Sequence, residues 1–327
     1  MSTAVTMAKA LNAGLREELT RDERLLLMGE DVTFGGGLFG VTENLVDDFG
    51  PERIIDMPIS EAGFTGFGLG CAVSGSPAVV EIQIMDFAAL AMDQICNRAA
   101  KLRYMTGGQI GVPLVVRMPG ASRIGLAAQH SQSLEGWFIN APGLKVVTPA
   151  TPSDAKGLLK SAIRDGNPIV FIEHRLLYSL RGEVADDELV PLGKARIVRD
   201  GSDITLIANS ICVRVAESAA QMLESDGISV ELIDLRTVKP LDRETIVASV
   251  AKTHRVIVIN EGNEVGGVAA EVASLIAGSE AFFDLEAPIK KVGVPDVPVP
   301  YAKELEEAVL PQAARVVTVA KQLLELS

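Results

Sequence analysis

The chain has 327 residues, of which 48% are apolar, and its 30 basic and 43 acidic side chains give a net charge of −13 at pH 7. This length is typical of about two domains, each large enough to bury a core of its own. The strong negative charge argues against nucleic acid or an anionic membrane surface as a partner, whereas it is compatible with a basic protein partner.

The first half of the chain alternates short apolar strands with helices. We expect an amphipathic helix over residues 6–19, capped by Thr6, and another helix over 87–104. Strands are expected at 25–28, 79–84, 112–117, 144–147 and 169–172, and the last two flank a helix over 153–164 that Ser153 and Asp154 would cap. Strands that are apolar throughout and alternate with helices predict a parallel sheet covered on both faces.

Residues 181–193 are acidic and contain glycine and proline, which indicates a linker. The α/β pattern then restarts, with strands expected at 204–208, 229–233, 255–259 and 289–292 and helices at 213–224, 242–251, 266–276 and 313–326. We therefore predict an α/β protein of two domains, the first at 1–180 and the second at 199–327, joined by a linker at 181–198.

The most informative stretch runs from Arg53 to Gly70 and reads RIIDMPISEAGFTGFGLG. A single carboxylate, Glu61, stands at the head of an apolar helix that contains glycines at 63, 66, 68 and 70. Each glycine costs a helix about 1 kcal/mol of stability relative to alanine. We therefore expect these glycines to let a backbone or a flat ligand come close to the helix. The alternative is structural: an acidic residue favoured by the helix dipole, followed by close helix packing.

His130 is the histidine best placed for chemistry, because it lies in the small, polar loop GLAAQHSQS after the third strand of this half. Loops at the carboxyl ends of strands host the sites of open α/β folds, and an imidazole can transfer protons near pH 7. The alternative is a histidine that orders the loop by bonding to its backbone. We expect structural or solvated roles for His174 and His254.

The remaining candidates carry less information. Cys71, Cys96 and Cys212 are isolated and form no CxxC pair, so neither a disulfide framework nor a zinc site is expected. No secretory leader pattern is visible, and we expect a cytoplasmic protein. Glu30 and Asp31 follow a strand, where we favour a structural or subunit-contact role.

Several segments resemble the β subunits of the E1 component of thiamine-diphosphate-dependent 2-oxo acid dehydrogenase complexes. Residues 53–66 are similar to the family's RIIDTPISExGFxG, with Met57 in place of the usual threonine. Further matches follow in order: AAQHSQ at 127–132, DLRTVKPLD at 234–242 and PVPYA at 298–302. The resemblance covers nearly the whole chain without large gaps.

The resemblance implies a transketolase-like pyrimidine-binding domain followed by a domain like the transketolase C-terminal domain. It implies that Glu61 binds N1′ of the aminopyrimidine of thiamine diphosphate, with Ile59 and Phe87 beside the cofactor. From the sequence alone, core packing is the better interpretation of Phe87. The resemblance also implies that His130 lines the active site near the substrate and the incoming lipoyl group.

A potassium ion is a further implication of the resemblance. Its ligands would be carbonyl oxygens of Leu114, Ala162, Ile163 and Asp165 together with the Asn167 region. Hard oxygen ligands suit such a cation, which would brace the sheet rather than react. From the sequence alone, residues 164–168 are better interpreted as a plain turn.

The chain contains no Gly-Asp-Gly, the motif with which thiamine enzymes anchor Mg²⁺ and the diphosphate. In the resembling family an E1 α subunit supplies it within an α2β2 assembly, so we expect this chain to be inactive alone. The other expected partner is E2, the dihydrolipoyl acyltransferase, through its lipoyl domain and its small, basic subunit-binding domain.

Three substrates remain open. Pyruvate, decarboxylated oxidatively with acyl transfer to the lipoamide of E2, is our first interpretation. Residues 35–42 and 101–105, together with QHSQS at 129–133, also resemble acetoin dehydrogenase β subunits, which cleave acetoin. Branched-chain members usually carry tyrosine before the histidine, where Gln129 stands, so they rank third. An interpretation of another class is a catalytically silent scaffold subunit.

Overall fold

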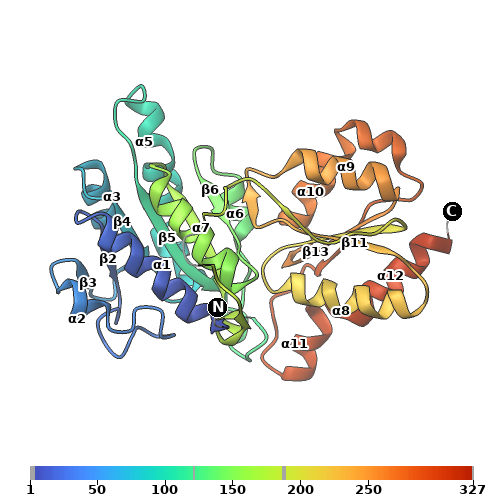
Figure 1. Cartoon of the computed structure of the whole chain (residues 1–327), viewed down its shortest axis with the longest axis horizontal. Helices are drawn as coiled ribbons and strands as arrows, with labels where there is room; N and C mark the ends of the chain where they lie inside the picture. The colour runs from blue at the N-terminus through green and yellow to red at the C-terminus, as the bar shows by residue number, and fades with distance from the viewer. Residues whose placement is uncertain (1–3, 121, 186–188, 326–327) are drawn as a thin grey trace. The chain divides into compact units, whose positions relative to one another are not determined.

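The computed structural model describes residues 4–120, 122–185 and 189–325. It divides into two compact units (Figure 1), the first made of Met1–Ala121 and Phe138–Leu192, the second of Ser122–Trp137 and Gly193–Ser327. The loop that carries His130 therefore belongs to the second unit, although its sequence interrupts the first. Residues 186–188 of the predicted linker lie outside the described residues.

Unit 1 is built on a parallel sheet with the strand order β6-β7-β5-β4-β2-β3. Its strands are β2 (Leu26–Gly29), β3 (Ile54–Asp56), β4 (Ala78–Glu81), β5 (Leu114–Gly120), β6 (Lys145–Val147) and β7 (Ile169–His174). Every residue of β4, β5 and β7 is buried, which explains why their sequences are apolar apart from Glu81, Arg117, Glu173 and His174. Because the strands are parallel, their carboxyl ends meet at one edge of the sheet.

Helices cover both faces of this sheet. On one face α1 (Met7–Arg21) packs against α7 (Pro152–Arg164), and the two lie side by side in Figure 1. On the other, α3 (Glu61–Val73) packs on β4 and contacts a second helical stretch. That stretch consists of η1 (Met85–Phe87), α4 (Ala88–Met92), the π-helix η2 (Asp93–Ala99) and α5 (Ala100–Met105).

Short elements complete unit 1. Strand β1 (Val5–Thr6) pairs antiparallel with β8 (Arg181–Gly182). The short helices are α2 (Leu45–Phe49) and η3 (Arg175–Ser179), while α6 (Glu135–Ile139) begins in the second unit and ends in the first.

Unit 2 contains a five-stranded sheet with the order β14-β13-β10-β11-β9. Its strands are β9 (Arg196–Arg199), β10 (Ile204–Ala208), β11 (Val230–Asp234), β13 (Val256–Asn263) and β14 (Lys290–Val294), and a short strand β12 (Thr237–Lys239) follows β11. All neighbours in this sheet are parallel except β9, which runs antiparallel to β11 at one edge.

The sheet of unit 2 is also sandwiched between helices. Helices α8 (Cys212–Ser225) and α12 (Ala313–Glu325) pack together on one face, below the strands in Figure 1. Helices α9 (Arg243–Thr253) and α10 (Val268–Ala277) cover the other face. Two shorter helices, η4 (Glu280–Asp284) and α11 (Lys303–Val309), complete the unit. No helix within the described residues combines the length and the apolar character needed to span a membrane.

Most expected elements are present, including the α1 cap, where the Thr6 side chain accepts a hydrogen bond from the Lys9 amide. Three expectations need correction. The helix expected over 87–104 contains a π-helical segment at Asp93–Ala99, a rare conformation that the sequence analysis did not predict. Helix α7 begins at Pro152 with Thr151 as its cap, since proline is tolerated in the first turn. The segment expected as a linker holds β8 and β9.

Candidate active site

Glu61 is the first residue of α3, on the connection that leaves the carboxyl end of β3. The residue is only 6% exposed. Its carboxylate forms no hydrogen bond or ion pair within the part of the chain that the structure describes. The helix dipole favours a negative charge in this first turn. A buried acceptor without an internal partner is suited to bind a polar atom of a ligand.

Glu30 follows β2 and belongs to the same edge of the sheet. Burial raises the pKa of its carboxyl group, and the nearby carboxylates of Glu61, Asp31 and Asp56 raise it further. Its Oε1 is buried without a hydrogen-bond partner among the described residues. Burial and the neighbouring carboxylates at this edge therefore both disfavour the charged form of Glu30, next to the carboxylate expected to bind the cofactor.

A buried ion cluster lies at the same edge. Arg117 on β5 pairs with Glu81, at the end of β4, and with Glu173 on β7, where Nη2 and Oε1 are 2.7 Å apart. Burial raises the pKa of Glu173 to about 7, an effect that Arg117 opposes. The sequence analysis did not single out Arg117, although a basic residue inside an apolar strand is a visible signal of a buried ion pair.

The glycine-rich loop at residues 34–40 lies beside this cluster. Gly37 has a φ of +74°, and a Cβ atom there would come within 2.7 Å of Oγ1 of Thr42 and 3.7 Å of Oε1 of Glu81. Thr42 Oγ1 in turn donates to the carbonyl oxygen of Val32 at 2.8 Å. The loop thus requires glycine for backbone conformation and close packing at the sheet edge.

The other two predicted cofactor contacts also leave carboxyl ends of strands in unit 1. Ile59 lies two residues before Glu61 and is 85% exposed, which leaves its side chain available for contact. Phe87 ends η1, just after β4, and is half-buried; its amide donates to the carbonyl oxygen of Ile84 at 3.0 Å. Glu61, Ile59 and Phe87 therefore come from two connections at one edge of one sheet.

His130 belongs to unit 2 and is half-buried. Its amide donates to the carbonyl oxygen of Ala127 at 3.3 Å, and Ala127 has a left-handed φ of +61°. Next to His130 in the sequence, Gln129, Gln132 and Ser133 line a cavity of about 440 Å³. The same cavity is lined by residues at the ends of β13 and β14, among them Glu261, Asn263 and Asp296. The loop thus places polar groups around open space at the carboxyl edge of the second sheet.

The other two histidines have hydrogen bonds to backbone atoms. His174 is buried, and its Nδ1 accepts from the amide of Leu176 at 3.2 Å. His254 ends α9 in a left-handed conformation, with Nδ1 2.8 Å from the carbonyl oxygen of Asp284. These contacts fit the structural roles expected for both residues.

The residues expected around potassium gather where α7 turns into β7. Asp165 Oδ1 and the Asp165 carbonyl oxygen accept from Asn167 Nδ2 at 2.7 and 3.3 Å, and the Asp165 carboxylate pairs with Lys145. The carbonyl oxygen of Ala162 accepts from the Asp165 amide at 3.3 Å. Leu114 and Ile163 are buried nearby in β5 and α7. Among the described residues there is no group of three or more acidic, histidine or cysteine side chains that could hold a metal ion.

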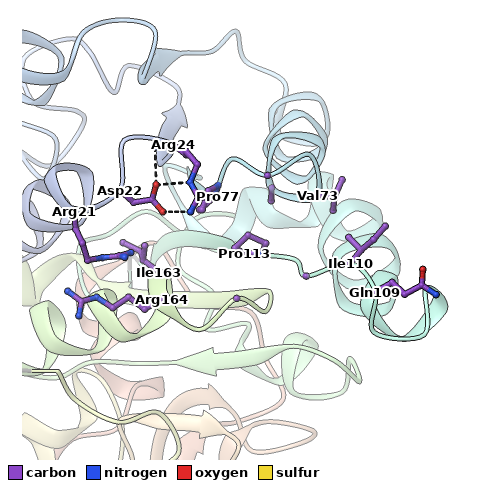
Figure 2. Close-up of a pocket in the computed structure, with 14 residues that line it drawn as sticks. Arg21, Asp22, Arg24, Val73, Pro77, Gln109, Ile110, Pro113, Ile163 and Arg164 are labelled. Carbon is purple, nitrogen blue, oxygen red and sulfur yellow. Dashed lines mark hydrogen bonds and ion pairs between the residues drawn. The ribbon is translucent and has the colours of Figure 1, made fainter.

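A larger cavity of about 570 Å³ lies at the opposite edge of the unit 1 sheet (Figure 2). It is lined by Pro77 and Pro113, which precede β4 and β5, and by Arg24, which Asp22 binds through hydrogen bonds of 2.9 and 3.0 Å. Of the residues predicted for the site, Ile163 alone lines it. Ligands of open α/β sheets bind at the carboxyl ends of strands, so we place the candidate site at Glu61 and not in this larger cavity.

Family models match both halves of the chain. The model of the transketolase pyrimidine-binding domain matches residues 3–181, and the model of the transketolase C-terminal domain matches residues 193–316. A solved structure titled as a split-gene transketolase in an inactive β4 tetramer superposes with a TM-score of 0.81, covering 99% of both chains at 22% identity. The last comparison supports the fold alone.

Curated relatives are closer in sequence. The mitochondrial pyruvate dehydrogenase E1 component subunit β of Dictyostelium discoideum is 44% identical over 98% of this chain and 91% of its own length. The corresponding subunit of Rhizobium meliloti is 46% identical over 97% of this chain and 69% of its own length. The 2-oxoisovalerate dehydrogenase subunit β of Bacillus subtilis is 44% identical over 97% of both chains. The chain therefore belongs to the E1 β subunits of the thiamine-diphosphate-dependent 2-oxo acid dehydrogenase complexes.

Proposed function

We propose that this E1 β chain supplies the pyrimidine-side half of an active site that decarboxylates pyruvate and passes the acyl group to the lipoamide of E2. The observation that carries the proposal is Glu61, a buried carboxylate without an internal partner among the described residues, at the carboxyl edge of a parallel sheet. The choice of pyruvate is supported by relatives named as pyruvate dehydrogenase subunits at 43–46% identity.

When bound, thiamine diphosphate supplies the carbanion chemistry, and the residues of this chain supply orientation and proton control. Glu61 would share a proton with N1′ of the aminopyrimidine. Ile59 and Phe87 would pack beside the ring. His130 would hold or donate a proton at the substrate oxygen or at the lipoyl sulfur.

We propose an E1 α subunit in an α2β2 assembly as the partner that completes the site and supplies the Mg²⁺ centre. The absence of Gly-Asp-Gly from the sequence supports a divided site. Support also comes from apolar side chains exposed on α3 and the helical stretch after it, namely Phe67 at 51%, Leu90 at 63%, Tyr104 at 90% and Met105 at 72%. Several large apolar side chains exposed on one set of helices are typical of a subunit interface.

Potassium and E2 docking complete the proposal. Potassium would be held by carbonyl oxygens in the turn between α7 and β7, where hard oxygen atoms gather. The basic subunit-binding domain of E2 would dock on unit 2. There the exposed carboxylates of Glu280, Asp284 and Glu286 stand close in sequence to Phe283, which is 87% exposed. The cytoplasm remains the proposed compartment.

E2 docking can be tested by its salt dependence. Because exposed charges are screened, affinity for the isolated E2 subunit-binding domain should fall at least tenfold between 50 and 500 mM salt, on the order expected from the Debye length. Calorimetric titration of the full chain at several salt concentrations would measure this. An affinity that does not respond to salt would contradict docking on the acidic surface.

The substrate is tested with a panel. The chain is co-expressed with its α-type partner and assayed with pyruvate, acetoin and branched-chain 2-oxo acids, using thiamine diphosphate, Mg²⁺ and an artificial electron acceptor. We expect turnover of pyruvate. Preference for a branched-chain acid would favour the function named for the Bacillus subtilis relative. Cleavage of acetoin would favour the acetoin dehydrogenase alternative. Cofactor binding that survives Glu61→Ala, without turnover of any substrate, would favour a scaffold subunit.

A further inference from the structure

The loop that carries His130, residues 122–137, is irregular up to Glu135, where α6 begins. Arg123 and Ala127 both adopt left-handed φ angles, +70° and +61°, which are unfavourable for residues other than glycine. A loop with this backbone keeps one conformation only if contacts outside it hold the strained residues in place. The structure provides such contacts within unit 2.

The principal contact comes from Glu306 on α11. Its carboxylate accepts hydrogen bonds from two backbone amides of the loop, with Oε1 2.8 Å from the Arg123 nitrogen and Oε2 3.2 Å from the Gly125 nitrogen. Glu306 is only 2% exposed, so its charge is taken from water and compensated by these amides. The two amides flank a single residue, and the carboxylate thus fixes the turn at the start of the loop.

A second buried carboxylate holds the neighbouring side chains. Oε2 of Glu261, in β13, accepts from Oγ of Ser122 at 2.5 Å, and its Oε1 pairs with Nε of Arg123. Nη2 of Arg123 also donates to the carbonyl oxygen of Pro311 at 2.8 Å. Arg123 is therefore held through its backbone by Glu306 and through its side chain by Glu261.

The other end of the loop is held by packing. Leu134 and Glu135 are buried, and a Cβ atom on Gly136 would come within 2.5 Å of the carbonyl oxygen of Gly266. With both ends held, His130 lies in the middle of a short span whose geometry depends on its anchors. Of these, Glu306 contacts the backbone of the loop and none of the residues expected to react.

We propose that Glu306 is a positioning residue for His130: its carboxylate fixes the backbone at 123–125 and thereby orders the histidine. The inference rests on the proposed role of His130 in the reaction. The substitution Glu306→Gln would keep the size of the side chain but leave one acceptor oxygen and place an NH₂ group against a backbone N–H. One of the two amides would lose its partner.

The test compares Glu306→Gln with Glu304→Gln in the full chain paired with its α-type partner. Glu304 lies on the same helix and is exposed, so it is a matched control. Hydrogen exchange of the amides at 123–132 should rise at least tenfold in Glu306→Gln and stay unchanged in the control. Turnover should fall about ten- to a hundredfold, the size of a lost hydrogen bond to a charged group, with a smaller change in KM.

The double variant Glu306→Gln/His130→Ala separates positioning from general stability. If Glu306 acts through His130, the turnover of the double variant should lie within about twofold of the turnover of His130→Ala alone. Additive losses, or unchanged exchange in the loop, would overturn the inference. Faster loop exchange with normal turnover in both His130→Ala and Glu306→Gln would support the anchoring by Glu306 and overturn the proposed role of His130. Glu306→Asp, which keeps the charge but shortens the reach, should show an intermediate effect if Glu306→Gln does not fold.

Discussion

Acidic side chains outnumber basic ones among the buried residues that the structure describes, and burial and neighbouring charges shift the pKa values of some of them. At the edge of the unit 1 sheet, Glu30 has a raised pKa through burial and nearby carboxylates, while Arg117 compensates Glu81 and Glu173. Glu61 stands among these groups without a hydrogen-bond partner of its own in the described part of the chain. We infer that Glu61 remains available to a ligand at this edge, while Glu81 and Glu173 are paired with Arg117.

Glu135 in unit 2 gives a pH prediction. It is buried, its Oε2 has no hydrogen-bond partner among the described residues, and burial followed by the charge of Glu261 raises its pKa to about 7 from 4.5. Between these values the folded chain holds a proton that the unfolded chain releases, so stability falls as pH rises from about 4.5 to 7.

Glu135→Gln should remove this dependence, because the amide does not titrate. Urea unfolding at pH 5, 6, 7 and 8 would measure the free energy of unfolding. Over this range it should fall further in the wild type than in the variant, by about 3 kcal/mol at most. Glu304→Gln serves as the control, since that residue is exposed. Equal pH dependence in wild type and Glu135→Gln would mean that the carboxyl group is not protonated in the folded state.

At this scale, sequence reasoning selected residues by their distinctive sequence surroundings, and their roles in the site stay predictions. Glu61 heads an apolar, glycine-rich helix that follows β3, and His130 lies within a polar loop that follows β5 in the sequence. The anchoring of the loop by Glu306 could not be predicted, because 183 residues separate Glu306 from Arg123 and no local pattern links them. The raised pKa of Glu30 likewise depends on burial and on carboxylates of different connections.

Among the elements, α3 shows how glycine serves packing. A Cβ atom on Gly68 would lie 2.5 Å from Cγ2 of Val80 and 3.2 Å from Sδ of Met28. Valine is stiff at χ1 and cannot move aside cheaply, so the helix can approach β4 this closely only through glycine. Gly70, on the same helix, is exposed and has nothing within 4 Å of its Cβ position.

We predict that Gly68→Ala destabilises the chain by about 1–3 kcal/mol, because the overlap with Val80 outweighs the gain in helix propensity. Gly70→Ala gains the propensity without the overlap and should be neutral or stabilised by up to about 1 kcal/mol. Urea unfolding of both variants measures the difference. If Gly68→Ala were as stable as Gly70→Ala, the close approach of α3 to β4 would be disproved.

Among the secondary-structure elements, those that are buried were predicted more accurately than those at an exposed edge. The strands β10 and β11 and the helices α8 and α9 lie where the sequence pattern predicted them, to within one or two residues at each end. Strand β9 was missed, because its sequence Arg-Ile-Val-Arg is polar at both ends and only half-buried at an antiparallel edge. Its pairing with β11 comes from tertiary context and not from local preference.

At the scale of the whole molecule, we propose that the chain supplies one side of a thiamine site. Its two units match the pyrimidine-binding and C-terminal domains of transketolase, and its relatives are E1 β subunits. The diphosphate-binding Gly-Asp-Gly motif is absent from the sequence. Because binding energy for the diphosphate and its Mg²⁺ would come from another chain, we predict that this chain turns over no 2-oxo acid alone.

The central claim is that Glu61 of this chain and the diphosphate-binding residues of an α-type partner form one active site. The most direct measurement is pyruvate turnover with thiamine diphosphate and Mg²⁺ in three samples: the chain alone, the chain paired with its α-type partner, and the same pair carrying Glu61→Gln. We predict activity in the wild-type pair only, with a loss of several orders of magnitude in the variant although the assembly still forms. Turnover by the single chain, or near-normal turnover by the variant pair, would contradict the claim.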